Sequence, residues 1–570
     1  MNALKKAYRV FSTAEKYFLF VIFFFATVMV VVNVLGRKLF GFSFNWLEEL
    51  NRYILVVCTF IGSAIATSDR LHPRMDMVVG MLKGKAKLVL ELIAAVVLTI
   101  FLAVMTYYAF GQLGKMLKIS AMTATLHVPV YVFFAFIPIG FCGMTLRSLI
   151  HTILMVADFR SSGKADAVVM MCAAGGVLMY TPTSLLVISQ QLFTGLDSTT
   201  LLAVPFFIVA GTIASRGKTS ESLVKCMNVI FGRLPGGPVI ATIATCAFFA
   251  AISGSSMATV VAVGSLMIPA LKEQGYPEDM SVGAVCSGGS LGILIPPSAP
   301  MVMFCVAMGT SVGKQFMAGF VPGILLALAW CVYVFVRCST KKLGSRVKYS
   351  AREAVKIFVQ GIPALMFPLI VLGSIYTGWA TPTEAAAIST VYGLLIEKFV
   401  YHTLKLKDMV GYFYRGIVQS ASLLLIIGTA TALSYLITVK QIPALVVEVI
   451  SGMVSSQFML VLVVMIILFI AGCFMDTIAL IVILAPILVP LLNMYNVDLI
   501  HFGIMAILAS QIGYISPPFG TNLFVTMQVS GKSFGFVAKS IVPYIIILIA
   551  MTLFICFVPQ ISLFLPGLMK

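Results

Sequence analysis

The chain has 570 residues, of which 60% are hydrophobic and only 10% charged, a composition typical of an integral membrane protein with many helices. Its formal net charge of +18 could suggest nucleic-acid binding, but the basic residues lie between apolar segments in the pattern of the positive-inside rule. We therefore expect a lipid bilayer as a partner, and no nucleic acid.

The first module is expected to be a bundle of four membrane helices over residues 1–157. Its apolar segments lie at 17–36, 52–68, 88–111 and 128–155. The first segment is long enough to span a bilayer and lacks a small-x-small cleavage site, so we expect an uncleaved span and not a secretory signal. The N-terminus and the 70–87 loop are more basic than the other two connections, which places the N-terminus in the cytoplasm.

A polar motif, NWLEEL at residues 45–50, separates the first two spans. It has the pattern of a helix start, in which Asn45 is the N-cap, Glu48 returns the hydrogen bond and Trp46 anchors at the membrane interface. This pattern leaves the role of Glu49 open.

The acidic pair Glu48 and Glu49 is too costly to bury in lipid, so we expect it to be solvent-exposed or paired with a basic group. Arg52 is the nearest basic group and lies on the same helical face. The alternative is a basic group of the larger module, such as Lys218 or Arg233. In that case the pair would fasten the two modules together.

Residues 158–166 form a polar junction, after which a larger module begins near residue 167. A strongly basic segment, residues 337–356, divides this module into two halves, 167–336 and 357–570. We expect the segment to be a cytoplasmic loop with room for an amphipathic helix, because apolar positions recur there at irregular helical spacing.

The patterns that would indicate an enzyme are incomplete. Residues 216–219, RGKT, look like the end of a phosphate-binding loop, but Gly211 and Gly217 enclose five residues and not four, and no strand precedes them. The eleven cysteines form no Cys-x-x-Cys pair, so neither a metal site nor a disulfide framework is suggested. No nucleophile–base pair or cluster appears among the five histidines. We therefore expect no enzyme, no cofactor and no use of ATP.

The stretch from 251 to 299 is too interrupted to form ordinary membrane spans, which need about 20 apolar residues. It opens with Ser253-Gly254-Ser255-Ser256, and a second apolar piece breaks at Ile295-Pro296-Pro297-Ser298. Non-helical backbone is tolerated at membrane depth only where it faces protein or a watery cavity. Its free carbonyls can hold cations, and the free amides at half-helix starts can hold anions.

The same pattern recurs later in the sequence. Pro269, Pro296, Pro297 and Pro322 are matched by Pro490, Pro517, Pro518 and Pro543, each pair 221 positions apart. At this offset Gly292 matches Gly513, Ser255 matches Asp476 and Ser256 matches Thr477. Paired interruptions in two halves are the best sequence indication of a transporter's binding site; the alternative is a pair of proline kinks that only shape helices. We predict that the two copies have opposite orientations in the membrane, and that both polar segments are hairpin tips within reach of the Pro-Pro breaks.

Two acidic residues in the second half are expected to cap helices. The sequence Thr381-Pro382-Thr383-Glu384 has the pattern of a capping box, which favours a structural role for Glu384. Asp476 can cap the half-helix that follows it or bind a hard cation, and both roles are compatible. Capping is favoured because Ser255, its repeat partner, can cap but carries no charge.

The motifs taken together resemble those of a known family. They are Trp46-x-Glu48-Glu49, Gly195–Ser198, Ser253–Ser255, Ile295–Ser298, Thr381–Ala385 and Ser516–Asn522. The first looks like the signature of the small subunit of a tripartite ATP-independent periplasmic (TRAP) transporter, and the others look like its large subunit. Over nearly its whole length the chain resembles the membrane component of such a transporter with the two subunits fused.

The resemblance implies an all-α polytopic membrane protein with an inverted-repeat elevator fold, in which two re-entrant helical hairpins accompany a four-helix scaffold. It implies sodium-coupled uptake of an organic acid that a periplasmic substrate-binding protein delivers. The substrate stays open among sialic acid, a C4-dicarboxylate and other carboxylates. We expect a monomeric fused permease in the bacterial inner membrane, with Na⁺ as its coupling ion.

The hypothesis assigns residues to two sodium sites and one substrate site. The first sodium site consists of Ser253, Gly254, Ser255, Ser256, Gly292, Pro296 and Ser298. The second consists of Asp476, Thr477, Gly513, Ser516, Pro517 and Gly520. The substrate carboxylate is expected near Ser298, Thr521 and Asn522. Carbonyl and hydroxyl oxygens of this kind suit Na⁺, which is a hard cation.

Two other functions stay open at this point. A proton-coupled organic-anion carrier without a binding protein would need a buried acid to titrate, and the candidates are Asp476, Asp197 and Glu384. A sodium titration of uptake at fixed pH separates this carrier from a sodium-coupled one. A channel or a non-transporting scaffold is a rival of another class, and the duplicated interruptions argue against it.

Overall fold

The computed structural model describes residues 2–69, 85–158, 186–347, 349–452, 454–517 and 520–569. These ranges are almost entirely helical and contain no β-strand. Eleven of their helices are long and apolar enough to cross a membrane. Most of the basic loop expected at 70–87, the junction at 158–166 with the start of the larger module, and Pro518 lie outside the described residues.

The chain forms two compact units that do not follow the order of the sequence. The first contains Met1–Pro205 together with Leu406–Leu445, and the second contains Phe206–Lys405 together with Val446–Lys570. The unit built around the first four membrane helices therefore also includes helices from the larger module.

The first unit is a helical bundle. Its helices are α1 (Asn2–Leu35), η1 (Gly36–Phe40), α2 (Trp46–Asp69), α4 (Lys85–Ile119), α5 (Val130–Phe134), α6 (Phe136–Asp158), α8 (Leu186–Leu196), η2 (Thr199–Leu202) and α18 (Leu406–Val439). The four expected spans correspond to α1, α2, α4 and the α5–α6 pair. Helix α2 packs against α6 and α18. Small residues permit this close approach: a Cβ added at Gly62 would lie 2.5 Å from Ala421, and the Ser63 hydroxyl donates to the Ala421 carbonyl at 3.1 Å.

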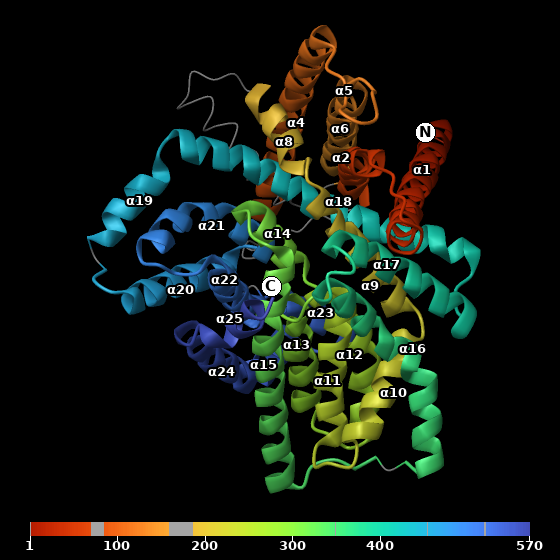
Figure 1. Ribbon diagram of the computed structural model, residues 1–570, viewed down its shortest axis with the longest axis vertical. Coiled ribbons are helices and arrows are strands. Elements are labelled where there is room, and N and C mark those ends of the chain that lie inside the picture. The colour runs from red at the N-terminus through yellow and green to blue at the C-terminus, as the bar shows by residue number, and fades with distance from the viewer. Residues whose placement is uncertain are drawn as a thin grey trace. The chain divides into compact units, whose positions relative to one another are not determined.

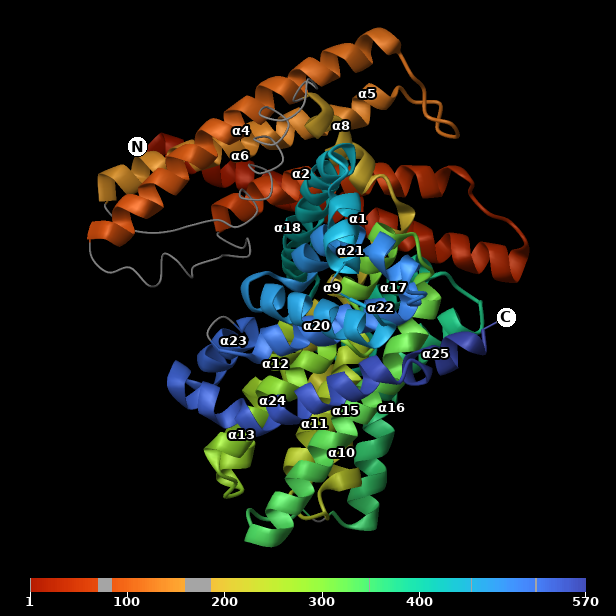
Figure 2. The same cartoon turned by 90° about the vertical axis from the view of Figure 1, so that its left-hand side faces the viewer.

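The second unit carries both copies of the repeated pattern. Two of its helices, which begin at Ala203 and at Ile442, start within the residues assigned to the first unit. Its first half has α9 (Ala203–Arg216), α10 (Thr219–Phe231), α11 (Gly237–Ser253), α12 (Ser256–Glu273), α13 (Glu278–Ser290), η3 (Leu291–Ile293), α14 (Ala299–Met308) and α15 (Val312–Lys341). Its second half has α16 (Ala351–Tyr376), α17 (Pro382–Leu395), η4 (Ile396–Val400), α19 (Ile442–Ser451), α20 (Gln457–Phe474), α21 (Thr477–Met494), α22 (Leu499–Ile515), α23 (Thr521–Ser530), α24 (Phe534–Phe557) and α25 (Gln560–Gly567). Helices α11, α12 and α13 lie side by side (Figure 1), and α24 runs alongside α13 (Figure 2).

The repeat found in the sequence is also present in the helices. Helix α12 (256–273) and helix α21 (477–494) begin and end at equivalent positions. The Gln511 amide donates to the Ser290 hydroxyl at 2.9 Å, and these two residues are themselves 221 positions apart. Equivalent positions of two repeats meet only near the axis that relates the repeats. Helices α13 and α22, which carry these two residues, therefore meet at equivalent positions of the two repeats.

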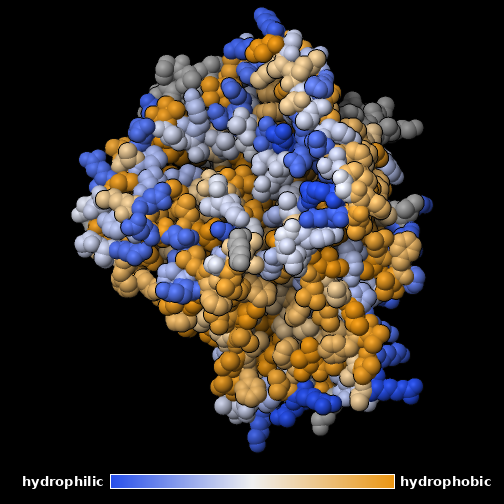
Figure 3. Space-filling view, in the orientation of Figure 1, coloured by the Kyte–Doolittle hydropathy of each residue, from blue (hydrophilic) through white to orange (hydrophobic). Residues whose placement is uncertain are grey.

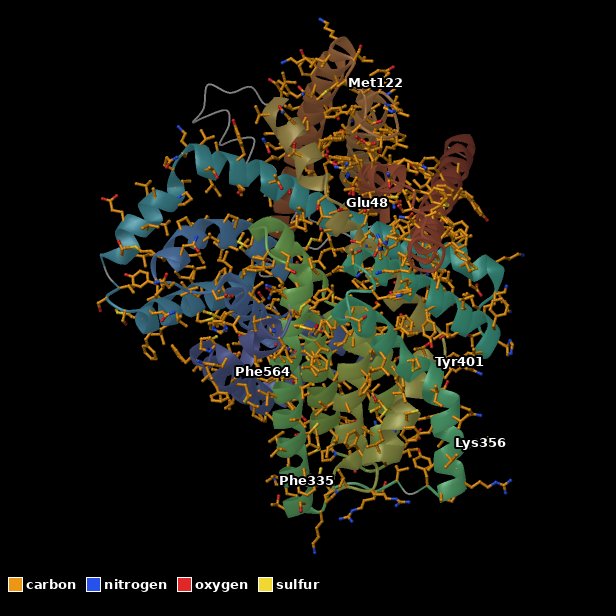
Figure 4. The ribbon with its side chains drawn as sticks, in the orientation of Figure 1. Glu48, Met122, Phe335, Lys356, Tyr401 and Phe564 are labelled. Atoms are coloured by element: carbon orange, nitrogen blue, oxygen red, sulfur yellow. The ribbon has the colours of Figure 1, made fainter. Side chains whose placement is uncertain are left out.

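The basic segment at 337–356 differs from the prediction. Helix α15 continues to Lys341 and α16 begins at Ala351, so both ends of the segment are helical but no separate amphipathic helix lies between them among the described residues. Backbone hydrogen bonds hold the connector in a non-helical conformation: the N–H groups of Ser345 and Val347 each donate at 3.0 Å to the carbonyls of the neighbouring turns. Hydrophilic side chains gather at this end of the unit (Figure 3), where Figure 4 labels Lys356.

The Glu278 carboxylate links two turns of the second unit, the one between α12 and α13 and the one between α23 and α24. Glu278, at the start of α13, accepts from Lys272 at 2.9 Å and from Lys532 in the turn between α23 and α24. The two ammonium groups lower the pKa of the Glu278 carboxyl from 4.5 to about 2.

The ion pair at Glu278 predicts a pH-dependent contribution to stability. Because its folded-state pKa is depressed, the stabilisation is complete above the ordinary pKa of 4.5 and is lost as the pH falls towards about 2. In low salt, Glu278→Gln should lower the melting temperature at pH 7, and the difference from the wild type should shrink below pH 4.5. A difference that stays constant from pH 7 to pH 3 would show that charge plays no part.

Candidate transport site

The first polar segment forms the turn between α11 and α12. Gly254 has a φ of +59°, which favours glycine, and its carbonyl accepts from the Ala299 N–H at 3.4 Å. A Cβ added at Gly292 would lie 2.6 Å from the Ser255 carbonyl oxygen. The turn therefore rests directly on the break between α13 and α14, and only glycines allow this approach. This is the predicted position of a hairpin tip against a Pro-Pro break.

The serines of this region also cap the half-helices. The Ser255 hydroxyl accepts from the Ala258 N–H at the start of α12, and the Ser298 hydroxyl accepts from the Met301 N–H at the start of α14, both at 3.4 Å. Ser298 also donates to the Ile293 carbonyl at 2.6 Å. These serines are therefore engaged in local structure, and the first predicted sodium site consists mainly of crowded backbone carbonyls.

The second polar segment forms the turn between α20 and α21. Asp476 is the N-cap of α21, since its carboxylate accepts from the Ile478 N–H at 3.1 Å, so the predicted capping role is confirmed. Its other oxygen accepts from the Tyr514 hydroxyl at 2.6 Å. A Cβ added at Gly513 would lie 2.2 Å from the Gly472 carbonyl oxygen. This turn therefore also rests on an interrupted helix, at the end of α22.

The remaining residues of the second predicted sodium site follow α22. Ser516 ends that helix, and its carbonyl accepts from the Gly520 N–H at 2.9 Å. A Cβ added at Gly520 would lie 2.6 Å from the Tyr514 carbonyl oxygen. Thr477 is buried, whereas Pro517 is exposed and borders residues 518–519, which the structure does not describe. The carbonyls here are again crowded around a glycine.

The three predicted substrate residues differ in their burial and contacts. Asn522 is fully buried, and its amide donates to the Ser256 hydroxyl at 2.7 Å and to the Cys286 carbonyl at 3.4 Å. Asn522 therefore connects α23 of the second repeat with the first tip. Thr521, one residue earlier, is exposed. Ser298 bonds to residues of its own break.

Sequence reasoning missed two residues that hold this region in place. Tyr514 donates its hydroxyl hydrogen bond to Asp476. The equivalent position in the first repeat is Ile293, so comparing the two repeats did not indicate a role for Tyr514. Glu397 is 1% exposed and accepts from the N–H groups of Lys218 and Thr219, each at 3.0 Å. It thereby fixes the start of α10, the helix that precedes α11.

The hydroxyls around Glu397 complete its hydrogen bonding, with Thr219 donating at 2.6 Å and Thr403 donating as well. Tyr401, labelled in Figure 4, follows η4 directly. The sequence feature that could have identified Glu397 is an acidic residue directly after an apolar helix. The predicted capping box of Glu384 with Thr381 is confirmed.

The prediction for Glu49 was wrong. Its side chain is 5% exposed and accepts from the N–H groups of Ala124, Thr125 and Leu126 at 2.7–2.9 Å, with no basic partner among the described residues. These three N–H groups converge on the Glu49 carboxylate. They provide the hydrogen bonds and partial positive charge that water and a counter-ion would otherwise provide. Its neighbour Glu48 is exposed, as expected.

Two of the three basic groups proposed as partners of the acidic pair have other contacts. Arg52 pairs with Asp197 at 3.0 Å, and Arg233 donates to the Tyr349 carbonyl at 3.1 Å. At Lys218 it is the backbone N–H that donates to Glu397. The Arg52–Asp197 pair joins α2 to the segment after α8. The first module is therefore linked to the larger module's sequence by this pair, and not by Glu48 or Glu49.

The Arg52–Asp197 pair can be tested by exchanging its charges. Both side chains are about one-third exposed, so Arg52→Asp or Asp197→Arg alone should cost only about 1 kcal/mol. Combining them should restore the melting temperature of the purified protein. If the double variant is as unstable as the two single variants together, the pair does not interact.

Comparison with known proteins identifies the family. A family profile described as "Tripartite ATP-independent periplasmic transporter, DctM component" matches residues 88–561. The isethionate TRAP transporter permease protein DctMQ of Oleidesulfovibrio alaskensis is 32% identical over 572 aligned residues, which cover 92% of this chain and 88% of that protein. The C4-dicarboxylate TRAP transporter large permease protein DctM of Pseudomonas aeruginosa is 39% identical over 391 aligned residues, which cover 69% of this chain and 92% of that protein.

A relative from Escherichia coli, the 2,3-diketo-L-gulonate TRAP transporter large permease protein, is 30% identical over 391 residues, covering 69% of this chain and 92% of that protein. Two of these relatives match only the larger part of the chain, whereas the DctMQ permease matches nearly all of it. The candidate site lies within the residues that the family profile covers. The chain belongs to the TRAP transporter family, as a multi-pass membrane permease of the fused type and not as an enzyme.

Proposed function

We propose that this permease couples the entry of Na⁺ to the uptake of an organic acid, which a periplasmic substrate-binding protein delivers to it in the bacterial inner membrane. The observation that carries the proposal is the pair of equivalent turns at Gly254–Ser255 and Met475–Asp476. Each rests on a glycine of an interrupted helix, where carbonyl oxygens crowd together. Oxygen-rich, largely uncharged surroundings of this kind favour a hard monovalent cation.

The substrate anion would bind between the two turns. Helices α14 and α23 both begin at breaks, and their first N–H groups carry the positive end of the helix dipole. Asn522 bonds to Ser256 beside the first turn. It would therefore keep the start of α23, where the anion would bind, close to that turn. The names of the relatives support an anionic substrate, since isethionate and C4-dicarboxylates are both organic anions.

We propose elevator-type alternating access for the transport cycle, with the two hairpins as its moving part. The positive charge of bound sodium would offset the negative charge of the organic anion. The two hairpins could then carry the site across the membrane. Each cation that moves fully inward gains about 2.3 kcal/mol per 100 mV of membrane potential. This energy would drive accumulation without ATP.

The contacts of the candidate acids favour sodium over protons as the coupling ion. Asp476 holds the Ile478 N–H and the Tyr514 hydroxyl, Asp197 is paired with Arg52, and Glu384 closes a capping box. Each of these acids has a structural role that its carboxylate form performs. A proton carrier would have to abandon such contacts in every cycle.

Asp476→Asn provides the test of the second sodium site. The substitution keeps the shape of the cap but removes the charge, so the sodium concentration for half-maximal uptake in proteoliposomes should rise about tenfold, equivalent to about 1.4 kcal/mol. Tyr514→Phe is the matched control: it removes one hydrogen bond but keeps the carboxylate, and should cause a smaller rise. An unchanged sodium dependence in Asp476→Asn would leave Asp476 as a cap only.

The same titration tests the proposed function itself. With the pH fixed, wild-type uptake should rise with sodium and saturate. Uptake that does not depend on the sodium concentration but follows an imposed pH gradient would contradict sodium coupling and show proton coupling.

A further inference from the structure

Each of the two hairpins in the second unit has an end opposite its tip, which we call its base. The first hairpin consists of α11 and α12, and its base is formed by residues 232–236 before α11 and 274–277 after α12. The second consists of α20 and α21, and its base is formed by residues 454–456 and 495–498. Because α11 has 17 residues, the base lies about 25 Å from the tip. The candidate transport site includes none of these base residues.

The connector between α15 and α16 crosses the base of the first hairpin and bonds to both arms. The Val347 N–H donates to the Gly232 carbonyl, before α11, at 3.0 Å. The Ser345 N–H and hydroxyl both donate to the Gln274 carbonyl, after α12, at 3.0 and 3.1 Å. The Ser345 carbonyl in turn accepts from the Tyr276 hydroxyl at 2.9 Å. Figure 1 shows the connector running below α11 and α10 from α15 to α16.

The connector is also closely packed on the hairpin. Tyr276 is 4% exposed, and a Cβ added at Gly344 would lie 2.4 Å from its ring. Gly344 has a φ of +68°, so both its backbone and the available space favour glycine. Arg233, beside the α11 arm, donates to the Tyr349 carbonyl at 3.1 Å. The connector is therefore a packed part of the hairpin base.

The base of the second hairpin is closed without a connector. The Tyr495 hydroxyl, after α21, donates to the Val454 carbonyl, before α20, at 2.6 Å. At the 221-residue offset, Tyr495 matches Gln274 and Val454 matches Arg233. The residues that directly follow Gln274 and Tyr495 both have a positive φ, of +77° and +53°. The same two positions are therefore joined in both repeats, directly in the second and through the connector in the first.

We propose that residues 343–349 are a strap that closes the base of the first hairpin and thereby positions its tip, and that Tyr495 has the same role in the second hairpin. Two helices joined only by the turn at their tip can pivot about that turn, and a bond between their other ends removes this freedom. The first tip rests on Gly292 through the Ser255 carbonyl, and a pivot of the arms would disturb this contact. The strap and Tyr495 act on the tips without contacting ion or substrate.

The position of a tip affects its affinity for a cation. A cation that binds the carbonyls of a turn requires the turn in its ordered position, so the apparent affinity falls with the fraction of molecules in which the turn is ordered. This step rests on the proposed sodium coupling, whereas the positioning of the tips does not. The positioning is therefore measured first, without transport.

The test measures amide hydrogen exchange of the purified permease by mass spectrometry, with peptides that cover each tip and each base. Gly344→Ala should displace the strap, because the added methyl group meets the Tyr276 ring. Tyr276→Phe is the milder variant, which keeps the ring and removes one hydrogen bond. In both variants exchange at residues 250–258 should rise at least about fivefold, the effect of one lost hydrogen bond, with no change at 472–480. Tyr495→Phe should produce the reverse pattern.

Gly378→Ala is the matched control. Gly378 also has a φ of +68°, but a Cβ there would meet nothing within 4 Å. The variant therefore adds the same backbone strain without touching the strap, and should leave both tips unchanged. A rise confined to the base peptides in Gly344→Ala and Tyr276→Phe would overturn the proposal, because the strap would then support only local structure. An equal rise at both tips would also overturn it.

The same variants separate the strap from the proposed coupling. In proteoliposomes, Gly344→Ala should raise the sodium concentration for half-maximal uptake and leave the maximal rate unchanged. If exchange at the first tip rises while the sodium dependence stays the same, the strap is supported and the first turn binds no sodium.

Discussion

Asn522→Ala is expected to reduce uptake more than any other single substitution in the second unit. The side chain is fully buried and connects α23 of the second repeat with Ser256 at the first tip and with the Cys286 carbonyl. Its removal leaves buried polar partners unsatisfied, at a cost of about 1–3 kcal/mol. If this cost falls on the transport-competent arrangement, the initial rate of uptake in proteoliposomes should fall between about 5-fold and 150-fold.

A double-mutant cycle with Ser256→Ala separates this contact from a general loss of packing. Because the two side chains share their hydrogen bond, the double variant should be scarcely worse than Asn522→Ala alone. Thr521→Ala, which changes the exposed neighbour, is the control and should have a small effect. If the effects of Asn522→Ala and Ser256→Ala simply add, the two repeats are not coupled through this bond.

Glu397→Ala is expected to produce the largest loss of stability. The carboxylate is almost completely buried and accepts from two backbone N–H groups and two threonine hydroxyls. Its loss leaves the first N–H groups of α10 without an acceptor, which should cost about 3 kcal/mol. The melting temperature of the purified permease should fall by about 3 °C.

Glu384→Ala supplies the comparison for Glu397, because Glu384 is also a buried acid that bonds to a helix start, but it does so within a local capping box. Its removal should cost only about 1 kcal/mol. Glu397→Gln should fall between the two, since one amide oxygen can still accept. Equal effects of Glu397→Ala and Glu384→Ala would contradict the anchoring role of Glu397.

The features that the sequence predicted well are those with a local or repeated pattern. The capping boxes depend on residues within one helical turn, so Thr381 and Glu384 could be read directly. The positions of the two hairpin turns followed from four prolines at one offset, because glycine and proline leave few other conformations. Helix α12 and its equivalent α21 then begin at the residues that this offset predicts.

The features that the sequence did not predict depend on distant parts of the chain. Glu49 accepts from N–H groups about 75 residues later, and nothing in its own helix indicates that a turn will provide them. The basic connector was expected to be a loop with room for a helix, and its hydrogen bonds to turns from other parts of the unit were not predicted. The bond of Asn522 to Ser256, 266 residues away, was not predicted either. Such convergence is a property of the fold, and periodicity does not reveal it.

Accumulation of substrate in proteoliposomes tests the central claim most directly. The substrate is first identified by a thermal-shift screen of the partner binding protein, and then supplied in radiolabelled form with that protein outside the vesicles. An inward Na⁺ gradient should concentrate it inside above the external level, and equal Na⁺ on both sides should abolish the accumulation. Accumulation without Na⁺, driven by a pH gradient alone, would contradict the account.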